Sequence, residues 1–187
     1  MNKPVKFLII GRTAAGKTEI AKAVAKELGL SIVKSYTDRP KRPSEEAESD
    51  HTHVSVPEMD DILKSENDPV VAFTEINGTR YCATLNQLKE NDIYVIDPMG
   101  WARLVDQYED EFRFVLIYIC TRETDRLKYW KARAGLVADF FDRSVSEDSM
   151  FKVFEKCASD YWSVFNLTSF ENAVKQTINI IEEEISR

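Results

Sequence analysis

The feature that most constrains the fold is a glycine-containing segment near the N-terminus, between an apolar run and a helical pattern. Residues 5–10 are apolar except for Lys6 and end at Gly11, which is typical of a buried strand. Apolar residues then recur at helical spacing over residues 18–28, and Gly29 supplies a stop signal. A strand, a tight loop and a helix in this order predict the first βα unit of an α/β fold.

The loop matches the pattern G-x-x-x-x-G-K-[ST] at every fixed position. Glycine allows a backbone with positive φ and leaves no Cβ in the way, so the loop amides can bind phosphate oxygens. The positive end of the following helix favours the same anion. By this chemistry Lys17 contacts the β- and γ-phosphates, and the Thr18 hydroxyl ligates Mg²⁺. We predict a nucleoside triphosphate site formed by Gly11, Arg12, Thr13, Ala14, Ala15, Gly16, Lys17 and Thr18.

The alternative for this segment is an ordinary glycine turn before a helix. With average residue frequencies, chance produces the full match in roughly 1% of chains of this size. A strand before the loop and a helix after it are also the context that phosphate binding requires. We therefore favour the phosphate-binding interpretation.

Composition argues against several other classes of protein. The chain has 187 residues, enough for one domain, with 43% hydrophobic and 30% charged residues. It holds no apolar run long enough to span a bilayer, and we expect no membrane binding. The formal charge of −7 argues against binding to nucleic acid backbones. Three widely spaced cysteines fit no zinc pattern and indicate a reduced, cytoplasmic setting.

Further apolar runs and helical patterns alternate along the chain. The patterns predict strands over residues 31–36, 70–76, 92–97, 112–120 and 162–168. They predict helices over residues 56–65, 86–90, 124–134, 144–163 and 171–185, the last capped by Ser169. Strongly apolar strands that alternate with helices indicate an α/β fold with a parallel sheet.

Two features outside the loop suggest a second ligand. Arg39 and Arg42 lie beside prolines in a polar segment, and paired guanidiniums suit bidentate phosphate binding. A solvated basic surface is the alternative for these arginines. Glu75 lies near the end of a predicted strand, where an exposed edge charge is the commoner case.

Several segments together resemble guanylate kinases. In that family the loop is followed by T-T-R-P-x-R-P-G-E, then D-Y-H-F-V-S, then E-x-x-G-x-x-Y-G-[TS]. The matching segments here are residues 36–43, 50–55 and 75–83, and Asp97-Pro98-Met99-Gly100 resembles the family's D-x-Q-G. The resemblance covers nearly the whole chain. It implies a P-loop NTPase-type parallel sheet with helices on both faces, plus small subdomains for the nucleoside monophosphate (NMP) and for a lid.

The resemblance also implies three subdomains. The core would comprise residues 1–34, 85–120 and 150–187, the NMP-binding part residues 35–84, and the lid residues 121–149. The implied reaction transfers a phosphoryl group from ATP, with Mg²⁺, to GMP or dGMP. Nucleotides would then be the partners, and the protein would be a monomer or a homodimer.

Site residues follow by resemblance at the matching positions. The phosphate of GMP would be bound by Arg39, Arg42, His51 and Tyr81. The guanine ring would be read by Ser35, Glu75 and Asp97. Charge on the transferring group would be neutralised by Lys17 and Arg39, and by Arg133 and Arg143 of the lid.

The sequence also departs from the family pattern. His51 stands where the family has a phosphate-binding tyrosine, and Ala83 replaces a hydroxyl residue that helps to read guanine. Cys82 replaces a glycine, and Val95 replaces the first aspartate of a D-x-D pair near the metal. Two alternatives therefore stay open. One is a kinase of the same fold with another phosphate-bearing acceptor, and the other is a guanylate-kinase-like binding module with little catalysis.

Overall fold

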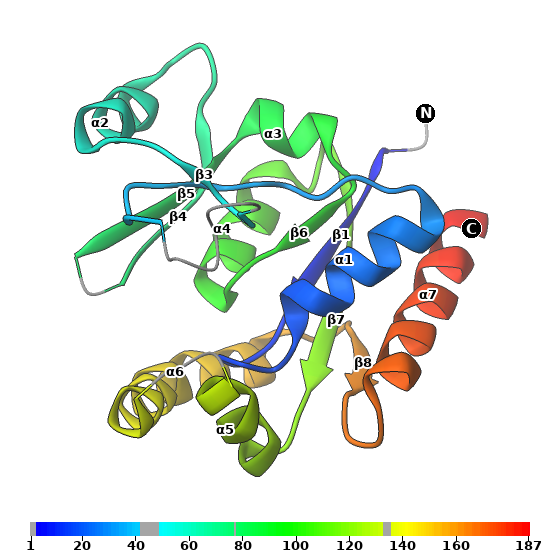
Figure 1. Cartoon of the computed structure of the whole chain (residues 1–187). Helices are drawn as coiled ribbons and strands as arrows, with labels where there is room; N and C mark the ends of the chain where they lie inside the picture. The colour runs from blue at the N-terminus through cyan, green and yellow to red at the C-terminus, as the bar shows by residue number, and fades with distance from the viewer. Residues whose placement is uncertain (1–2, 42–48, 77, 133–135) are drawn as a thin grey trace.

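A four-stranded parallel sheet forms the centre of the molecule (Figure 1). The structure, a computed structural model, describes residues 3–41, 49–76, 78–132 and 136–187. The strand order is β6-β1-β7-β8, and every pairing is parallel. These strands are β1 (Val5–Ile10), β6 (Ile93–Val95), β7 (Arg113–Cys120) and β8 (Trp162–Phe165). The predicted parallel sheet is confirmed.

Helices cover both faces of this sheet because both faces of its strands are apolar. Phe7 and Ile9 pack toward α1 (Lys17–Leu28) and α7 (Phe170–Ser186). Their neighbours Leu8 and Ile10 point the other way, toward α4 (Pro98–Tyr108) and α6 (Val137–Cys157). The alternation of side chains along β1 therefore divides the core into two layers. The predicted α/β fold class is correct.

One strand prediction is wrong. Residues 31–36 contribute only an isolated parallel bridge between Ile32 and Ile93 at the edge of the sheet. The chain then leaves this sheet, because the backbone of Tyr36 and Thr37 pairs with strands of a second sheet instead.

The second sheet has the order β3-β2-β5-β4 and lies beside the first (Figure 1). Its strands are β2 (Tyr36–Thr37), β3 (Thr52–His53), β4 (Val70–Ile76) and β5 (Thr79–Thr84). Two helices accompany it, α2 (Val56–Lys64) and α3 (Leu85–Glu90), and each begins with a capping box. Helix α4 contacts β4, and Ala72 and Gly100 lie in close contact between them.

Two helices differ from the sequence pattern. Helix α4 was not predicted; Asp97 caps it by accepting hydrogen bonds from the backbone N–H groups of Met99 and Gly100, both at 2.9 Å. Helix α6 begins at Val137 instead of residue 144 and ends at Cys157 instead of residue 163. The boundary error arises because apolar residues occur on both the buried and the exposed sides of α6.

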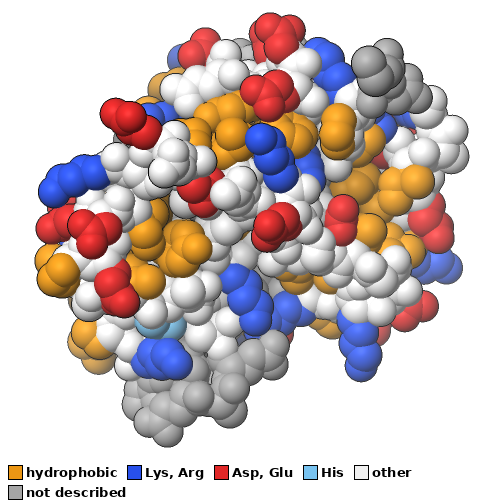
Figure 2. Space-filling model, turned by 90° about the horizontal axis from the view of Figure 1, so that it is seen from above, with side chains coloured by type: hydrophobic (Ala, Val, Ile, Leu, Met, Phe, Trp, Pro, Cys, Tyr) orange, Lys and Arg blue, Asp and Glu red, His pale blue; other side chains and the backbone are white. Residues whose placement is uncertain are grey.

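The other predicted elements agree closely with the structure, whereas β3 and β5 were not predicted. Helix α5 (Glu123–Ala132) occupies the charged segment, and Ser169 caps α7 by accepting from the N–H of Asn172. Figure 2 shows acidic and basic side chains interspersed on the upper face, with apolar side chains between them. Within the described ranges, none of the helices has the length and apolar character that crossing a bilayer requires.

Phe154 tests the layer between the sheet and α6. Its ring lies edge-to-face with Trp101 at 5.2 Å and with Tyr118 at 5.5 Å between centroids, and it is 2% exposed. Replacing Phe154 with Ala should lower the free energy of unfolding by about 3–5 kcal/mol through lost burial and a cavity. The adjacent Val153 is 60% exposed, so Val153→Ala should change it by less than about 0.5 kcal/mol. Urea unfolding followed by circular dichroism measures both values, and equal effects would contradict this packing.

Candidate functional site

The glycine loop lies at the carboxyl edge of the parallel sheet, between β1 and α1. Gly16 caps α1 with a left-handed backbone, φ 91°, as the motif predicts. Gly11 is required for space, since a Cβ there would lie 2.9 Å from the carbonyl oxygen of Ile119. Ala14 also has a positive φ, 59°, which is uncommon for a residue with a side chain. The loop therefore adopts a tightly determined conformation.

Two side chains from neighbouring strand ends hold the loop. The carbonyl oxygen of Ala15 accepts hydrogen bonds from Thr121 Oγ1 at 2.9 Å and from Asn166 Nδ2 at 3.1 Å. Thr121 follows β7, and Asn166 follows β8. The sequence analysis missed both residues. Their positions directly after two strands could have indicated them, because the carboxyl ends of parallel strands meet at one edge of the sheet.

Lys17 and Thr18 lie in the first turn of α1. Lys17 Nζ donates to the carbonyl oxygens of Gly11 at 2.6 Å and of Arg12 at 3.1 Å. Thr18 is half-buried beside it. The ammonium group thus lies across the first part of the loop, where it adds positive charge.

Arg126 of α5 is a further cation at the loop, and the sequence analysis missed it. The residue is 4% exposed, and its guanidinium donates to the carbonyl oxygen of Thr13 at 3.2 Å and lies 5.3 Å from the Phe140 ring centroid. Burial and the nearby charge of Arg12 lower the pKa of Arg126. Its Nε has no hydrogen-bond partner within the described residues. A buried guanidinium with unused donor capacity beside this loop suits an anion.

Helix α6 places two carboxylates on the same loop. Glu147 accepts from the backbone N–H of Thr13 at 2.9 Å and from the Thr13 hydroxyl. Asp148 accepts from Arg12, whose guanidinium also lies 4.8 Å from the Phe151 ring centroid. Burial alone would lower the pKa of Arg12, but the hydrogen bond to Asp148 and nearby negative charge raise it. A carboxylate therefore bonds to a loop amide that the motif assigns to phosphate.

The second sheet brings together three of the predicted acceptor residues. Ser35 is buried, and its Oγ lies 3.0 Å from His51 Nδ1. The His51 ring meets Tyr81 edge-on, with 5.4 Å between centroids. Arg39 lies nearby in the chain, and its Nη1 donates to the carbonyl oxygen of Pro40 at 2.9 Å. Arg42 lies outside the described residues.

Glu75 and Asp97 occupy neighbouring elements. Glu75 is exposed on β4, opposite Arg80 of β5. Asp97 Oδ1 caps α4, and Oδ2 accepts from the hydroxyl of Thr74, the residue before Glu75. Both oxygens of Asp97 are therefore engaged within the protein, whereas the Glu75 carboxylate faces solvent.

The two predicted lid arginines are placed differently. Arg143 of α6 lies over the Trp130 ring, 5.7 Å from its centroid, and so packs against α5. Arg133 lies outside the described residues. Among the arginines of α5 and α6, Arg126 is the one that the described structure bonds to the loop.

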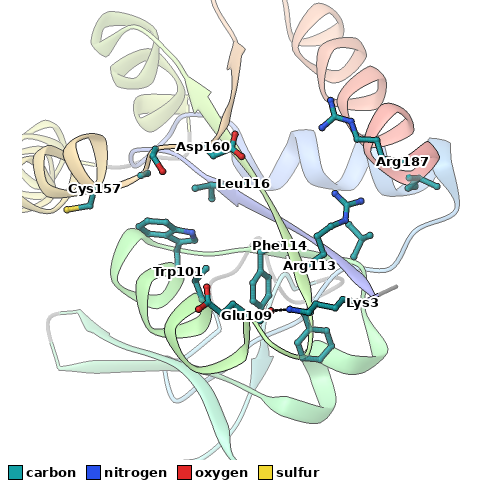
Figure 3. A pocket seen from close by; sticks show the side chains of 15 residues that line it. Lys3, Trp101, Glu109, Arg113, Phe114, Leu116, Cys157, Asp160 and Arg187 are labelled. Atoms are coloured by element: carbon teal, nitrogen blue, oxygen red, sulfur yellow. Dashed lines mark hydrogen bonds between the residues drawn. The ribbon is translucent and has the colours of Figure 1, made fainter. Parts of the chain in front are cut away.

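Two cavities bear on the location of the site. One of about 280 Å³ adjoins the loop and is lined by Arg12, Arg126, the last residues of β7 and β8 and the residues that follow these strands. Another, of about 930 Å³, lies at the opposite edge of the sheet (Figure 3). Its cations are already engaged within the protein, since Lys3 donates to the Glu109 carbonyl oxygen and Arg113 pairs with Glu184. The unused donor capacity at Arg126 favours the loop edge as the functional site.

Comparison with known proteins finds similarity of fold. No family model matches the chain, and no curated protein matches it. A guanylate kinase from Anaplasma phagocytophilum is a similar structure, with a TM-score of 0.67 and 16% identity over 98% of this chain and 87% of that one. TT1252 from Thermus thermophilus has a TM-score of 0.54 and 13% identity, over 98% of both chains. The chain therefore has a nucleotide-kinase-like α/β fold, of the kind seen in that guanylate kinase.

Asn166 tests the anchoring of the loop. Asn166→Ala removes a buried donor from the Ala15 carbonyl and should cost about 1–3 kcal/mol of stability. Asn166→Asp should cost more at neutral pH, because it places a buried carboxylate against the same carbonyl oxygen. Lowering the pH should narrow the difference between the variants, since a protonated carboxyl can donate. Denaturant melts at several pH values, with the exposed Asn172→Ala as control, would contradict this if the Asp variant were the more stable at pH 7.

Proposed function

We propose that the protein is an ATP-dependent nucleoside monophosphate kinase that converts GMP or dGMP to the diphosphate. The observation that carries this proposal is the complete phosphate-binding loop at the carboxyl edge of the sheet, with Gly16 left-handed and Lys17 across the loop. A second sheet that groups Ser35, His51 and Tyr81 supports a separate acceptor site. The similarity of fold to a guanylate kinase agrees with both.

Mg²⁺ is the metal that this chemistry requires. The Thr18 hydroxyl, in the first turn of α1, would ligate it. Within the described ranges, no three His, Cys, Asp or Glu side chains gather as a metal site. Phosphates and water would then supply most ligands, which is how Mg²⁺ is usually held at phosphate sites. The residues present therefore fit Mg²⁺, and when bound it would neutralise charge on the β- and γ-phosphates.

Catalysis would consist of positioning and charge neutralisation. An oxygen of the acceptor phosphate attacks the γ-phosphorus of ATP, and the bond from that phosphorus to the β–γ bridging oxygen breaks, which leaves ADP. Loop amides and Lys17 would bind the donor phosphates, and Arg126 would add charge beside them. Arg39 would bind the acceptor phosphate. No side chain needs to form a covalent intermediate.

Base selection is proposed to rest on the Glu75 carboxylate. Guanine presents N1–H and an N2 amino group side by side, and Glu75 would accept from both. Adenine lacks N1–H, so the carboxylate would face an unprotonated nitrogen and the unmatched groups would stay unpaired. Ala83 is buried and supplies no hydroxyl, which removes one contact from this selection.

One observation favours a second candidate function, a binding module with little catalysis. Glu147 already bonds to the N–H and hydroxyl of Thr13, where a phosphate of ATP would have to bind. A module of this kind would show little turnover with any acceptor. A coupled assay of ADP formation with ATP and GMP, dGMP, AMP, CMP or UMP therefore separates the kinase from the binding module. The same assay identifies a kinase that prefers another acceptor.

Lys17 provides the test of the kinase proposal. The wild type should form ADP fastest with GMP or dGMP. Lys17→Ala should lower that rate by about 100-fold or more, because the ammonium stabilises the transferring phosphoryl group. Lys26→Ala, exposed on the same helix, is the matched control and should leave the rate unchanged. A wild-type rate in Lys17→Ala would contradict the proposal that this loop is the site of phosphoryl transfer.

Glu147 provides a separate test at the donor site. Glu147→Gln keeps an acceptor for Thr13 but removes the charge that would repel the γ-phosphate. Affinity for a non-hydrolysable ATP analogue should rise about 3- to 10-fold, measured by calorimetric titration. Asp142→Asn, exposed on the same helix, removes an equal charge away from the loop and should change little. Unchanged or weaker binding in Glu147→Gln would show that this carboxylate does not compete with phosphate.

A further inference from the structure

His53 of β3 bonds to the backbone of Arg39. Its Nδ1 lies 2.7 Å from the Arg39 carbonyl oxygen, and its Nε2 lies 2.8 Å from Ser49 Oγ. A carbonyl oxygen can only accept, so Nδ1 carries the hydrogen of the neutral ring. Nε2 then accepts from the Ser49 hydroxyl. The two contacts thus fix both the tautomer and the orientation of the imidazole.

Ser49 extends this chain of hydrogen bonds to the other acceptor residues. Its Oγ accepts from the backbone N–H of His51 at 3.2 Å. His51 Nδ1 in turn lies 3.0 Å from Ser35 Oγ, and its ring meets Tyr81. Hydrogen bonds through His53 and Ser49 therefore link Arg39 to the segment of His51 and Ser35, and the His51 ring contacts Tyr81.

The backbone of Arg39 is held on both sides. Its N–H donates to Thr37 Oγ1 at 3.2 Å, and Thr37 Oγ1 donates to the Arg80 carbonyl oxygen at 2.9 Å. Its carbonyl accepts from His53, whose own backbone pairs with Thr37 across β2 and β3. Loss of the imidazole would release one of the two sides and leave the guanidinium less well oriented.

We propose that His53 is a positioning residue for the acceptor site: its imidazole holds Arg39, and through Ser49 the turn that carries His51, so that both can bind the phosphate of a nucleoside monophosphate. This inference rests on the proposed function. The pattern D-Y-H-F-V-S has Phe at the corresponding position, and a phenyl ring can make neither hydrogen bond. The positioning role therefore depends on the imidazole that this chain has at residue 53.

Three substitutions of His53 separate the two nitrogens. The amide nitrogen of His53→Asn can occupy the place of Nδ1 and keep the bond to Arg39. The longer side chain of His53→Gln can reach Ser49 but not serve Arg39, and His53→Phe keeps neither bond. Thr52→Ala, exposed on the same strand, is the matched control for disturbance of β3.

The experiment measures KM for GMP, KM for ATP and kcat in each variant. His53→Phe and His53→Gln both lose the hydrogen bond to Arg39 and should raise KM for GMP about tenfold. KM for ATP and kcat should stay within about twofold, and His53→Asn should restore KM for GMP to within about threefold of the wild type. If His53 had only a structural role, its substitution would lower the melting temperature without raising KM for GMP selectively, and His53→Asn would not restore that KM. In the wild type, long-range ¹H–¹⁵N spectra should show the Nδ1–H tautomer of His53.

Each contrary outcome has a definite meaning. If the wild type turns over GMP and His53→Phe behaves as Thr52→Ala does, the positioning role is overturned and the kinase proposal stands. If Asn rescues no better than Phe, or the spectra show Nε2–H, the donation to Arg39 is overturned. If the wild type phosphorylates no monophosphate, the proposed function fails, and this inference fails with it.

Discussion

Strand β1 is paired on both edges and buried on both faces, and the rest of the structure depends on this position. Its neighbours β6 and β7 run parallel to it, so three strand ends meet beside the loop that follows β1. The pairing of β1 fixes the point where that loop begins, and hydrogen bonds to the Ala15 carbonyl oxygen hold its far end. The loop amides, the start of α1 and the anchors on the Ala15 carbonyl are consequently fixed relative to one another.

The protein itself partly neutralises the positive charge at the loop. Arg12, Lys17 and Arg126 bring three cations to one short segment, while Glu147 and Asp148 bring two anions from α6. Cations packed this closely repel one another in a partly buried site, and the carboxylates relieve that repulsion. A bound polyphosphate would relieve it as well. The carboxylates of α6 thus occupy the place next to these cations that a polyphosphate would need.

The second sheet orients polar groups along its β2 and β3 edge, whereas Val71, Ala72 and Ala83 of β4 and β5 lie in the hydrophobic core. Its hydrogen bonds run between side chain and backbone at Thr37, His53 and Ser49, and Arg80 bonds to Asp38 through both its N–H and its guanidinium. Such bonds hold backbone in place where apolar burial is limited. The contact between α4 and β4 then joins this polar assembly to the core.

Local patterns in the sequence determined the strand, loop and helix of residues 5–28, the helix cap at Ser169, and the parallel sheet, because periodicity, glycine φ and capping act within a few residues. They failed for residues 31–36 and for α6, where pairing and two-sided packing override local preference. Only the tertiary structure decided which side chains serve the loop. Thr121 and Asn166 bond to Ala15 from 106 and 151 residues away, and Arg126 and Glu147 reach Thr13 from 113 and 134 residues away. These contacts follow from the order of strands and the docking of helices, which no local pattern encodes.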